Sequence, residues 1–335
     1  MPACRICGNE AGNKSYVARE MQFGLRDEFE YFECASCGCV QIREIPEDLA
    51  KYYPQDYYSY QSAQSPIEYN KPGLKGFKER FIRDRITNYY LNRNSRLGAW
   101  LEKKSSLAAN YVFQLNWMRL QRLNLKLDFA SSILDVGCGS GYLLNEMAAY
   151  GFTDLTGVDP FIERDIAYGN GVRILKRNLE EIEQQFDFVM LHHSFEHMPD
   201  PRATLKKLYA LTKFKRYLLI RIPVADSYAW RKYGVNWYAL DAPRHLHLHT
   251  RQSMSRLAEQ AGFQVADVVF DSNGHTLIAS EQYLRGIPFM ASESFFGNPA
   301  QTLFSPEEVE SFRKLDEELN SKGEADCAGF YLYKN

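Results

Sequence analysis

Two pairs of cysteines near the amino terminus have the spacing of metal ligands. Cys4 and Cys7 form one C-x-x-C-Gly unit, and Cys34 and Cys37 form a second. Two thiolates at this spacing can bind one metal ion, while the glycine permits the tight turn beneath them. Disulfide bonds are the alternative, but the cytosol, where we expect this chain to be, keeps cysteines reduced. We therefore predict a structural zinc ion bound by these four thiolates, with Cys39 as a bystander.

A glycine-rich stretch in the middle of the chain is a second candidate site. Residues 133–141 read Ile-Leu-Asp-Val-Gly-Cys-Gly-Ser-Gly, an apolar run that breaks into three alternating glycines. This pattern predicts a buried parallel strand that turns sharply into a helix beginning near Tyr142. The bare backbone lets a ligand approach, and the N–H groups at the helix start attract an anionic group. A dinucleotide-binding turn, G-x-G-x-x-G, would need its third glycine at position 142, so that strict pattern fails.

The spacing Asp135-x-Gly137-x-Gly139-x-Gly141 resembles the first motif of class I S-adenosylmethionine (SAM) methyltransferases. Asp159 ends the next predicted strand, where a carboxylate can accept hydrogen bonds from ribose hydroxyls. Asn178 stands where this class often has an Asp for the adenine amino group, and its side-chain oxygen can still accept a hydrogen bond. A glycine-rich turn without a ligand is the alternative. The resemblance implies SAM as the cofactor, bound by Asp135, Gly137, Cys138, Gly139, Gly141, Asp159, Pro160, Asn178, Leu179 and His192.

Histidines gather in two segments that follow the predicted fourth and fifth strands of the core. A histidine titrates in the range that is useful for removing a proton from an acceptor, and we expect His193 first, and His245 second, to act as general base. For each, a hydrogen-bonded histidine that shapes a loop is the alternative. We expect Glu196 and His197 to anchor the start of a helix. A metal role for the His193 and His197 pair with Glu196 lacks a convincing ligand set.

Aromatic and polar side chains near these segments are candidates for binding the acceptor. Tyrosines number 22, and tyrosine-rich surfaces suit polyhydroxylated or ring-shaped ligands, although a large aromatic core explains them equally well. Tyr57 belongs to a cluster that could close over a cleft or pack the amino-terminal unit against the core. Arg244 could pair with Asp241 or hold a phosphate. The predicted acceptor-binding residues are Tyr57, Tyr228, Trp237, Tyr238, Asp241 and Arg244.

The overall composition limits the partners of the chain. Its net charge of −2 over 335 residues gives no global field that would draw it to nucleic acid. No apolar run approaches the ~20 residues of a membrane span, and no basic and then apolar leader precedes Cys4, so we expect a cytoplasmic protein. A basic helix near 71–96 could contact an anionic lipid surface or a diphosphate-bearing substrate. A solvated helix face is the alternative.

These patterns divide the chain into three regions. Residues 1–45 are predicted to form a zinc ribbon, and 46–128 an aromatic and helical connecting and lid region. Residues 129–335 are predicted to form the SAM-binding core, with a helical insertion at about 273–325. The alternation of strand and helix patterns predicts an α/β protein. The resemblance implies that the core is a doubly wound, seven-stranded, Rossmann-like methyltransferase sheet.

The ribbon followed by this core resembles methyltransferases of sugar and polysaccharide biosynthesis. The resemblance implies methyl transfer from SAM to a small or carbohydrate-type acceptor, such as a nucleotide-linked sugar or a glycan. A zinc-ribbon RNA methyltransferase is one alternative. The net charge of −2 argues against it, because proteins that bind a phosphate backbone present a basic surface to it. A non-catalytic scaffold that keeps the fold is the other, and an absence of SAM binding would favour it.

Overall fold

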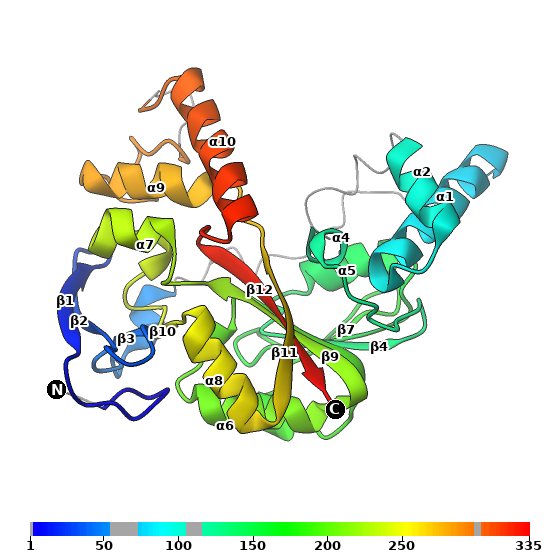
Figure 1. Ribbon diagram of the computed structural model, residues 1–335, viewed down its shortest axis with the longest axis horizontal. Coiled ribbons are helices and arrows are strands. Elements are labelled where there is room, and N and C mark those ends of the chain that lie inside the picture. Colours follow the sequence, from blue (N-terminus) through cyan, green and yellow to red (C-terminus); the bar gives the residue numbers. More distant parts are fainter. Residues whose placement is uncertain (1–2, 54–72, 105–115, 298–302) are drawn as a thin grey trace.

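A mixed sheet of eight strands forms the centre of the molecule in the computed structural model, which describes residues 3–53, 73–104, 116–297 and 303–335 (Figure 1). From one edge to the other, its strands are β11 (Phe263–Phe270), β12 (Cys327–Lys334), β9 (Thr212–Pro223), β8 (Phe186–His192), β4 (Ser132–Val136), β5 (Asp154–Val158), β7 (Arg173–Leu175) and β6 (Ile166–Ala167). The central five, β9 to β7, run parallel, whereas β12 is antiparallel to both its neighbours. The predicted doubly wound, seven-stranded sheet is confirmed, and the two-residue β6 extends its edge.

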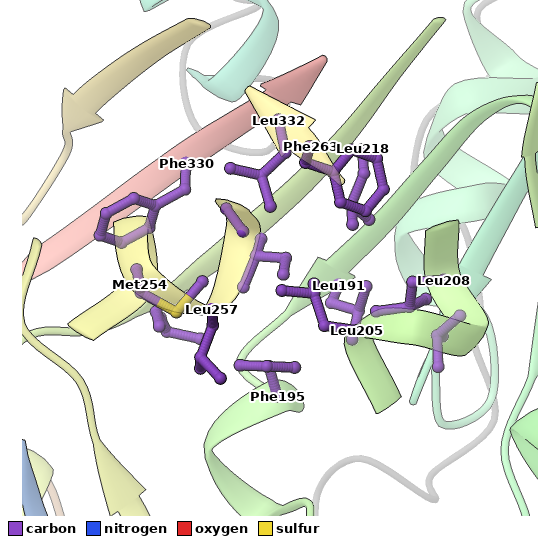
Figure 2. Close-up of a cluster of buried hydrophobic side chains, with 14 of the residues drawn as sticks. Leu191, Phe195, Leu205, Leu208, Leu218, Met254, Leu257, Phe263, Phe330 and Leu332 are labelled. Atoms are coloured by element: carbon purple, nitrogen blue, oxygen red, sulfur yellow. The ribbon is translucent and has the colours of Figure 1, made fainter. Parts of the chain in front are cut away.

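Two helices cover one face of the sheet. They are α6 (Pro201–Leu211) and α8 (Arg251–Ala261), and their apolar sides meet the strands in the cluster shown in Figure 2. Leu205 and Leu208 of α6 pack there beside Leu257 of α8, against the apolar side chains of β8, β9 and β12. Thr250 caps α8 and Gly262 ends it, with a φ of 95°.

Helices from two parts of the chain cover the opposite face. They are α1 (Gly73–Asn92), α4 (Asn116–Leu120) and α5 (Tyr142–Ala149), and they share a buried cluster with Phe188 and Leu219 of the sheet. Helix α2 (Arg96–Lys104) packs on α1, and the two project at the end of the molecule opposite the ribbon (Figure 1).

The outer side of α1 and α2 is both basic and apolar. Leu74 is 90% exposed, Trp100 is 58% exposed, and basic residues lie among the apolar ones. The predicted contact of this basic helix with a lipid surface stays a prediction. Among the helices of the described ranges, none combines the length and the apolar character needed to cross a bilayer.

The predicted ribbon is completed by the core. Its sheet contains β1 (Lys14–Arg19), β2 (Glu28–Glu33), β3 (Val40–Ile42) and β10 (His247–Leu248), and β10 comes from the loop before α8. The Thr250 hydroxyl donates to the Cys37 carbonyl at 2.6 Å, and the Arg202 guanidinium donates to the Ile6 carbonyl at 2.6 Å. Because the apolar side chains of the cysteine turns belong to the same buried cluster as α6 and α8, ribbon and core share one hydrophobic interior.

The predicted insertion also contains helices. These are α9 (His275–Leu284) and α10 (Pro306–Lys322), which pack with α7 (Tyr228–Tyr233) against the ribbon sheet. Five short 3-10 turns complete the described elements: η1 (Leu49–Tyr52), η3 (Leu179–Glu181), η4 (Phe195–His197), η5 (Gly234–Asn236) and η6 (Tyr238–Leu240).

The close packing of β5 against the glycine turn predicts that Gly157 tolerates no side chain. A Cβ atom at Gly157 would clash with Cys138 Sγ and lie 2.8 Å from Ile174 Cδ1. We expect Gly157→Ala to lower the free energy of unfolding by about 1–3 kcal/mol because of this overpacking, as measured by urea denaturation. Gly169→Ala is the control, since a Cβ atom there meets nothing within 4 Å. Equal unfolding midpoints for the two variants would contradict this packing.

Candidate functional site

A cavity of about 920 Å³ opens at the edge of the sheet where the parallel strands end. Residues that directly follow β4, β5 and β8 line it, namely Gly137, Asp159 and His193. Asn178 and Leu179, which follow β7, line it as well. Ligands of doubly wound sheets bind at this edge, so the cavity lies where a bound cofactor is expected.

The glycine turn after β4 forms one wall of the cavity. Gly137, Gly139 and Gly141 all have positive φ, which favours residues without a side chain, and α5 begins at Tyr142 as predicted. A Cβ atom at Gly137 would lie 2.5 Å from Ser194 Cβ, so this glycine is also required for close packing. The Ser194 hydroxyl donates to the Val136 carbonyl at 2.7 Å and holds the two loops together.

Asp159 is held in a fixed orientation at the tip of β5. Its Oδ2 accepts from the N–H of Gly139 at 2.9 Å, and its Oδ1 accepts from the N–H of Phe161 at 2.9 Å. Burial raises the pKa of Asp159, although these two N–H groups oppose the rise. Each carboxylate oxygen has a second lone pair, so Asp159 can still accept hydrogen bonds from a ligand in the cavity.

Several predicted cofactor residues lie behind the cavity rather than in its lining. Asp135 is buried, and its pKa is raised to about 7 by burial and then by the nearby charge of Asp159. Cys138, Gly139 and Gly141 shape the turn without lining the cavity, whereas Pro160 lines it. The His192 ring lies 6.1 Å from the ring of Trp117. Trp117 belongs to the buried cluster that α1, α4 and α5 form with the sheet. For the residues that do not line the cavity, the structure supports a role in shaping it rather than direct contact with a ligand.

His193 lies in the cavity and is held between two charged groups. The Arg221 guanidinium donates to His193 Nε2, so the ring proton is on Nδ1, which is 3.5 Å from Glu196 Oε1. Arg221 Nε in turn donates to Asp271, at 2.9 Å and 2.8 Å from its two carboxylate oxygens. Arg221 and Asp271 were not predicted. Asp271 directly follows the last residue of β11, so the strand-end rule could have identified it.

His245 and His197 also line the cavity, and each has one fixed ring nitrogen. His245 Nδ1 donates to the Ala239 carbonyl at 2.7 Å, and His197 Nδ1 donates to the Arg244 carbonyl at 2.9 Å. Glu196 lies behind them, fully buried. Burial opposes ionisation of Glu196, but the adjacent rings of His193, His245 and His197 lower its pKa to about 2.

Asp241 and Arg244 form a buried ion pair with each other. Arg244 Nε donates to Asp241 Oδ2 at 2.9 Å, and Arg244 Nη1 reaches Glu20 Oε1 at 3.3 Å and the Tyr52 carbonyl at 3.2 Å. Of the two predicted roles of Arg244, the structure therefore supports the pairing with Asp241. This pair connects the loop before β10 to the ribbon.

The predicted acceptor-binding aromatic residues separate into three groups. Tyr238 lines the cavity, beside His275 at the start of α9. For Trp237 the prediction is wrong, because this side chain is only 1% exposed and its Nε1 donates to Asp326 at 2.7 Å. Tyr228 does not line the cavity either, since α7 packs toward α9 and the ribbon sheet. Tyr57 lies outside the described residues.

The four predicted metal-binding cysteines lie together. Cys4 Sγ is 3.6 Å from Cys37 Sγ, Cys7 Sγ is 3.5 Å from Cys34 Sγ, and all four sulfurs lie within 4.8 Å of one another. Thiolates at about 2.3 Å from a tetrahedral zinc ion would be about 3.8 Å apart, so the donor set fits a structural metal ion. Cys39 is buried nearby and lies outside this group, as expected of a bystander.

Comparison with known proteins identifies one domain. A family model described as "Methyltransferase domain" matches residues 94–268. The ubiquinone biosynthesis O-methyltransferase of Pseudomonas putida strain F1 is 30% identical over an alignment of 127 residues, which covers 34% of this chain and 53% of that protein. The enzyme of the same name from Pseudomonas savastanoi pv. phaseolicola is 27% identical over 191 residues, which are 51% of this chain and 80% of that protein. The chain thus spans about half the length of the first of these relatives.

Solved structures give a weaker likeness. A SAM-dependent methyltransferase from Archaeoglobus fulgidus aligns with a TM-score of 0.40 and 18% sequence identity, covering 70% of this chain and 98% of that chain.

The cysteine cluster predicts a bound zinc ion. We expect about one zinc ion per purified chain, and we expect Cys7→Ser to lose it and to unfold at lower urea concentration, because a small ribbon depends on its metal. Metal content is measured by mass spectrometry of the dialysed protein. Cys39→Ser is the matched control and should retain the zinc, since Cys39 is outside the ligand group. Equal zinc content in both variants would refute the ligand assignment.

Proposed function

The chain belongs to the methyltransferase-domain family, and on that premise we propose that it transfers a methyl group from SAM to a small or carbohydrate-type acceptor. The acceptor class includes nucleotide-linked sugars and glycans. The observation that carries the proposal is the cavity itself, which brings Asp159 and Asn178 together with His193 at the carboxyl ends of the parallel strands. At about 920 Å³ it is near the upper end of the range of small-molecule sites, which is consistent with an acceptor bound beside the cofactor.

The residues at one end of the cavity fit SAM. When bound, SAM supplies an activated methyl group, so the chain must mainly bind, orient and deprotonate. Asp159 presents two fixed carboxylate oxygens to ribose hydroxyls. Asn178 offers an amide, and Leu179 an apolar surface, to the adenine ring. The glycine turn lets the cofactor lie against backbone.

The other end of the cavity suits an acceptor with several hydroxyl groups. Ser272, Asn273 and Tyr238 line it and can donate or accept hydrogen bonds. The names of the relatives support an oxygen as the methylated atom. They also make a hydroxylated aromatic ring the second candidate acceptor, which the rings of Tyr238 and His275 could flank.

His193 is the proposed general base. Its Nδ1 proton faces Glu196, which leaves the lone pair on Nε2 to take a proton from the acceptor. Arg221 now donates to that nitrogen, and Asp271 holds Arg221 beside it. Binding of the acceptor must therefore displace this contact.

The direct test is an assay with labelled SAM. The protein is incubated with nucleotide sugars, catechol-type phenols and RNA in parallel, and products are examined by mass spectrometry for the gain of one methyl group. Methylation of a nucleotide sugar supports the proposal. Methylation of a phenol alone, or of RNA alone, would show that the acceptor is not a carbohydrate. No SAM binding at all would favour the alternative of a non-catalytic scaffold.

The role of Asp159 predicts a loss of SAM affinity. We expect Asp159→Ala to weaken SAM binding by about 1–3 kcal/mol, because hydrogen bonds to a charged group are lost. The measurement is isothermal titration calorimetry. Asp154→Ala is the control, since Asp154 lies at the opposite end of β5 in an exposed pair with Arg173. Unchanged affinity in Asp159→Ala would remove Asp159 from the cofactor site.

The proposed base predicts a loss of turnover without a loss of cofactor affinity. We expect His193→Ala to lower kcat about 10²–10⁴-fold, because the proton acceptor is gone. Turnover is measured with the acceptor found in the assay above, and SAM affinity by calorimetry serves as the internal control. A wild-type kcat for this variant would exclude His193 as the base.

A further inference from the structure

Glu196 is a buried carboxylate that lies beside the rings of three histidines. It is 0% exposed in the turn η4, and neither of its oxygens accepts a hydrogen bond of normal geometry from the described part of the chain. The nearest ring nitrogens are His193 Nδ1 at 3.5 Å and His245 Nε2 at 4.0 Å, both measured to Oε1. An isolated carboxylate in the protein interior is destabilising by several kcal/mol, so its surroundings must supply positive charge.

Two histidines beside Glu196 have the tautomer that metal ligands require. Carbonyl oxygens only accept hydrogen bonds, so the bond from His245 to the Ala239 carbonyl puts the proton of that ring on Nδ1. The bond from His197 to the Arg244 carbonyl does the same for the second ring. The lone pair of each ring is therefore on Nε2. Hydrogen bonding of one imidazole nitrogen to a backbone carbonyl is the usual way in which a protein orients a metal-binding histidine.

The potential donor atoms are close enough to share one ion. One oxygen of Glu196 and one ring nitrogen each of His197 and His245 lie within 4.8 Å of one another. Donors at about 2.1 Å from a common ion are about 3–4 Å apart, so a small inward movement of the side chains completes the site. His197 and His245 line the cavity, which leaves the remaining coordination positions open toward it.

We propose that Glu196, His197 and His245 bind a divalent transition-metal ion in the wall of the cavity. Two imidazoles and one carboxylate suit Mn²⁺, Fe²⁺ or Zn²⁺. This site is separate from the four-cysteine cluster. Unlike that cluster, it leaves coordination positions of the ion open. Sequence spacing could not identify it, because His245 comes from the loop after β9, whereas Glu196 and His197 follow β8.

An ion at this place has a consequence for the acceptor. An open coordination position can bind a hydroxyl oxygen of the acceptor and lower the pKa of that hydroxyl, which eases its deprotonation by His193. This consequence rests on the proposed methyl transfer, whereas binding of the ion does not. Coordination by the ion would restrict the acceptor to a molecule that offers an oxygen ligand.

Metal binding can be measured in the protein as it is purified. After weakly bound metals are removed by dialysis with EDTA, the zinc-containing protein is titrated with Mn²⁺ and free Mn²⁺ is followed by electron paramagnetic resonance. Mn²⁺ prefers oxygen and nitrogen ligands and does not displace zinc from four thiolates. We expect one bound Mn²⁺ per chain. A parallel titration with Zn²⁺, followed by calorimetry, should show one equivalent beyond the zinc already present.

Matched variants locate the ion. His197→Asn and His245→Asn each keep an amide N–H near the place of Nδ1, for the bond to the backbone carbonyl, and remove Nε2. We expect each to weaken Mn²⁺ binding at least tenfold, while thermal unfolding and the zinc of the four cysteines stay as in the wild type. His275→Asn is the control, because His275 lines the same cavity outside the ligand group and should leave Mn²⁺ binding unchanged.

The outcomes separate the metal site from the proposed function. Absence of a second bound ion in both titrations would overturn the proposal, as would wild-type Mn²⁺ affinity in folded His197→Asn and His245→Asn. Bound Mn²⁺ in a protein that methylates no acceptor would uphold the site and count against methyl transfer.

Discussion

The hydrogen bond between the glycine turn and the carboxylate at the tip of the neighbouring strand shapes the cofactor end of the cavity. The N–H of Gly139 donates to Asp159 Oδ2 at 2.9 Å, which joins the segment after β4 to the tip of β5. The two strands are parallel neighbours, so their carboxyl ends lie at the same edge of the sheet. The turn can approach this closely because its three glycines adopt positive φ. The orientation of Asp159, and thus the position of any bound ribose, follows from this contact.

The cysteine ribbon forms a wall of the same cavity. Tyr53 and Gln22 line the cavity from the ribbon side, and Arg244 joins the ribbon to the loop that carries His245. Arg244 and Glu20 are fully buried and Asp241 is largely buried, and removing one member of such a group would leave an uncompensated charge in the interior. The four-cysteine cluster therefore acts on the site through structure. It holds in place a surface that the acceptor would contact.

Local patterns in the sequence placed Gly137, Asp159 and Asn178 at the cavity, but they did not distinguish lining residues from buried ones among the other predicted residues. The glycine turn and Asp159 lie at the ends of predicted strands, and Asn178 lies three residues beyond the end of β7, so strand-end geometry places them without knowledge of tertiary packing. Trp237 was misassigned because an aromatic residue in a loop has no periodicity that tells which way its side chain points. The structure directs it inward, to Asp326. The same limit hid β10, whose two residues pair with β3 far away in the sequence.

Residues that act in groups were the hardest to predict. Arg221 lies within β9, where its position in the sequence gives no sign that its side chain reaches His193 and Asp271. Glu196 and His197 were interpreted as a helix start, and only the fold brings His245 to them. Charge and hydrogen-bond networks of this kind depend on contacts between distant segments, for which sequence spacing carries no information.

A crystal structure of the protein with S-adenosylhomocysteine, the product form of the cofactor, tests the central claim most directly. The account predicts the ribose hydroxyls on the carboxylate of Asp159, the adenine beside Asn178 and Leu179, and the sulfur facing the histidines of the cavity. A complex in which the nucleoside binds elsewhere, or a cavity that takes a nicotinamide dinucleotide in its place, would contradict it.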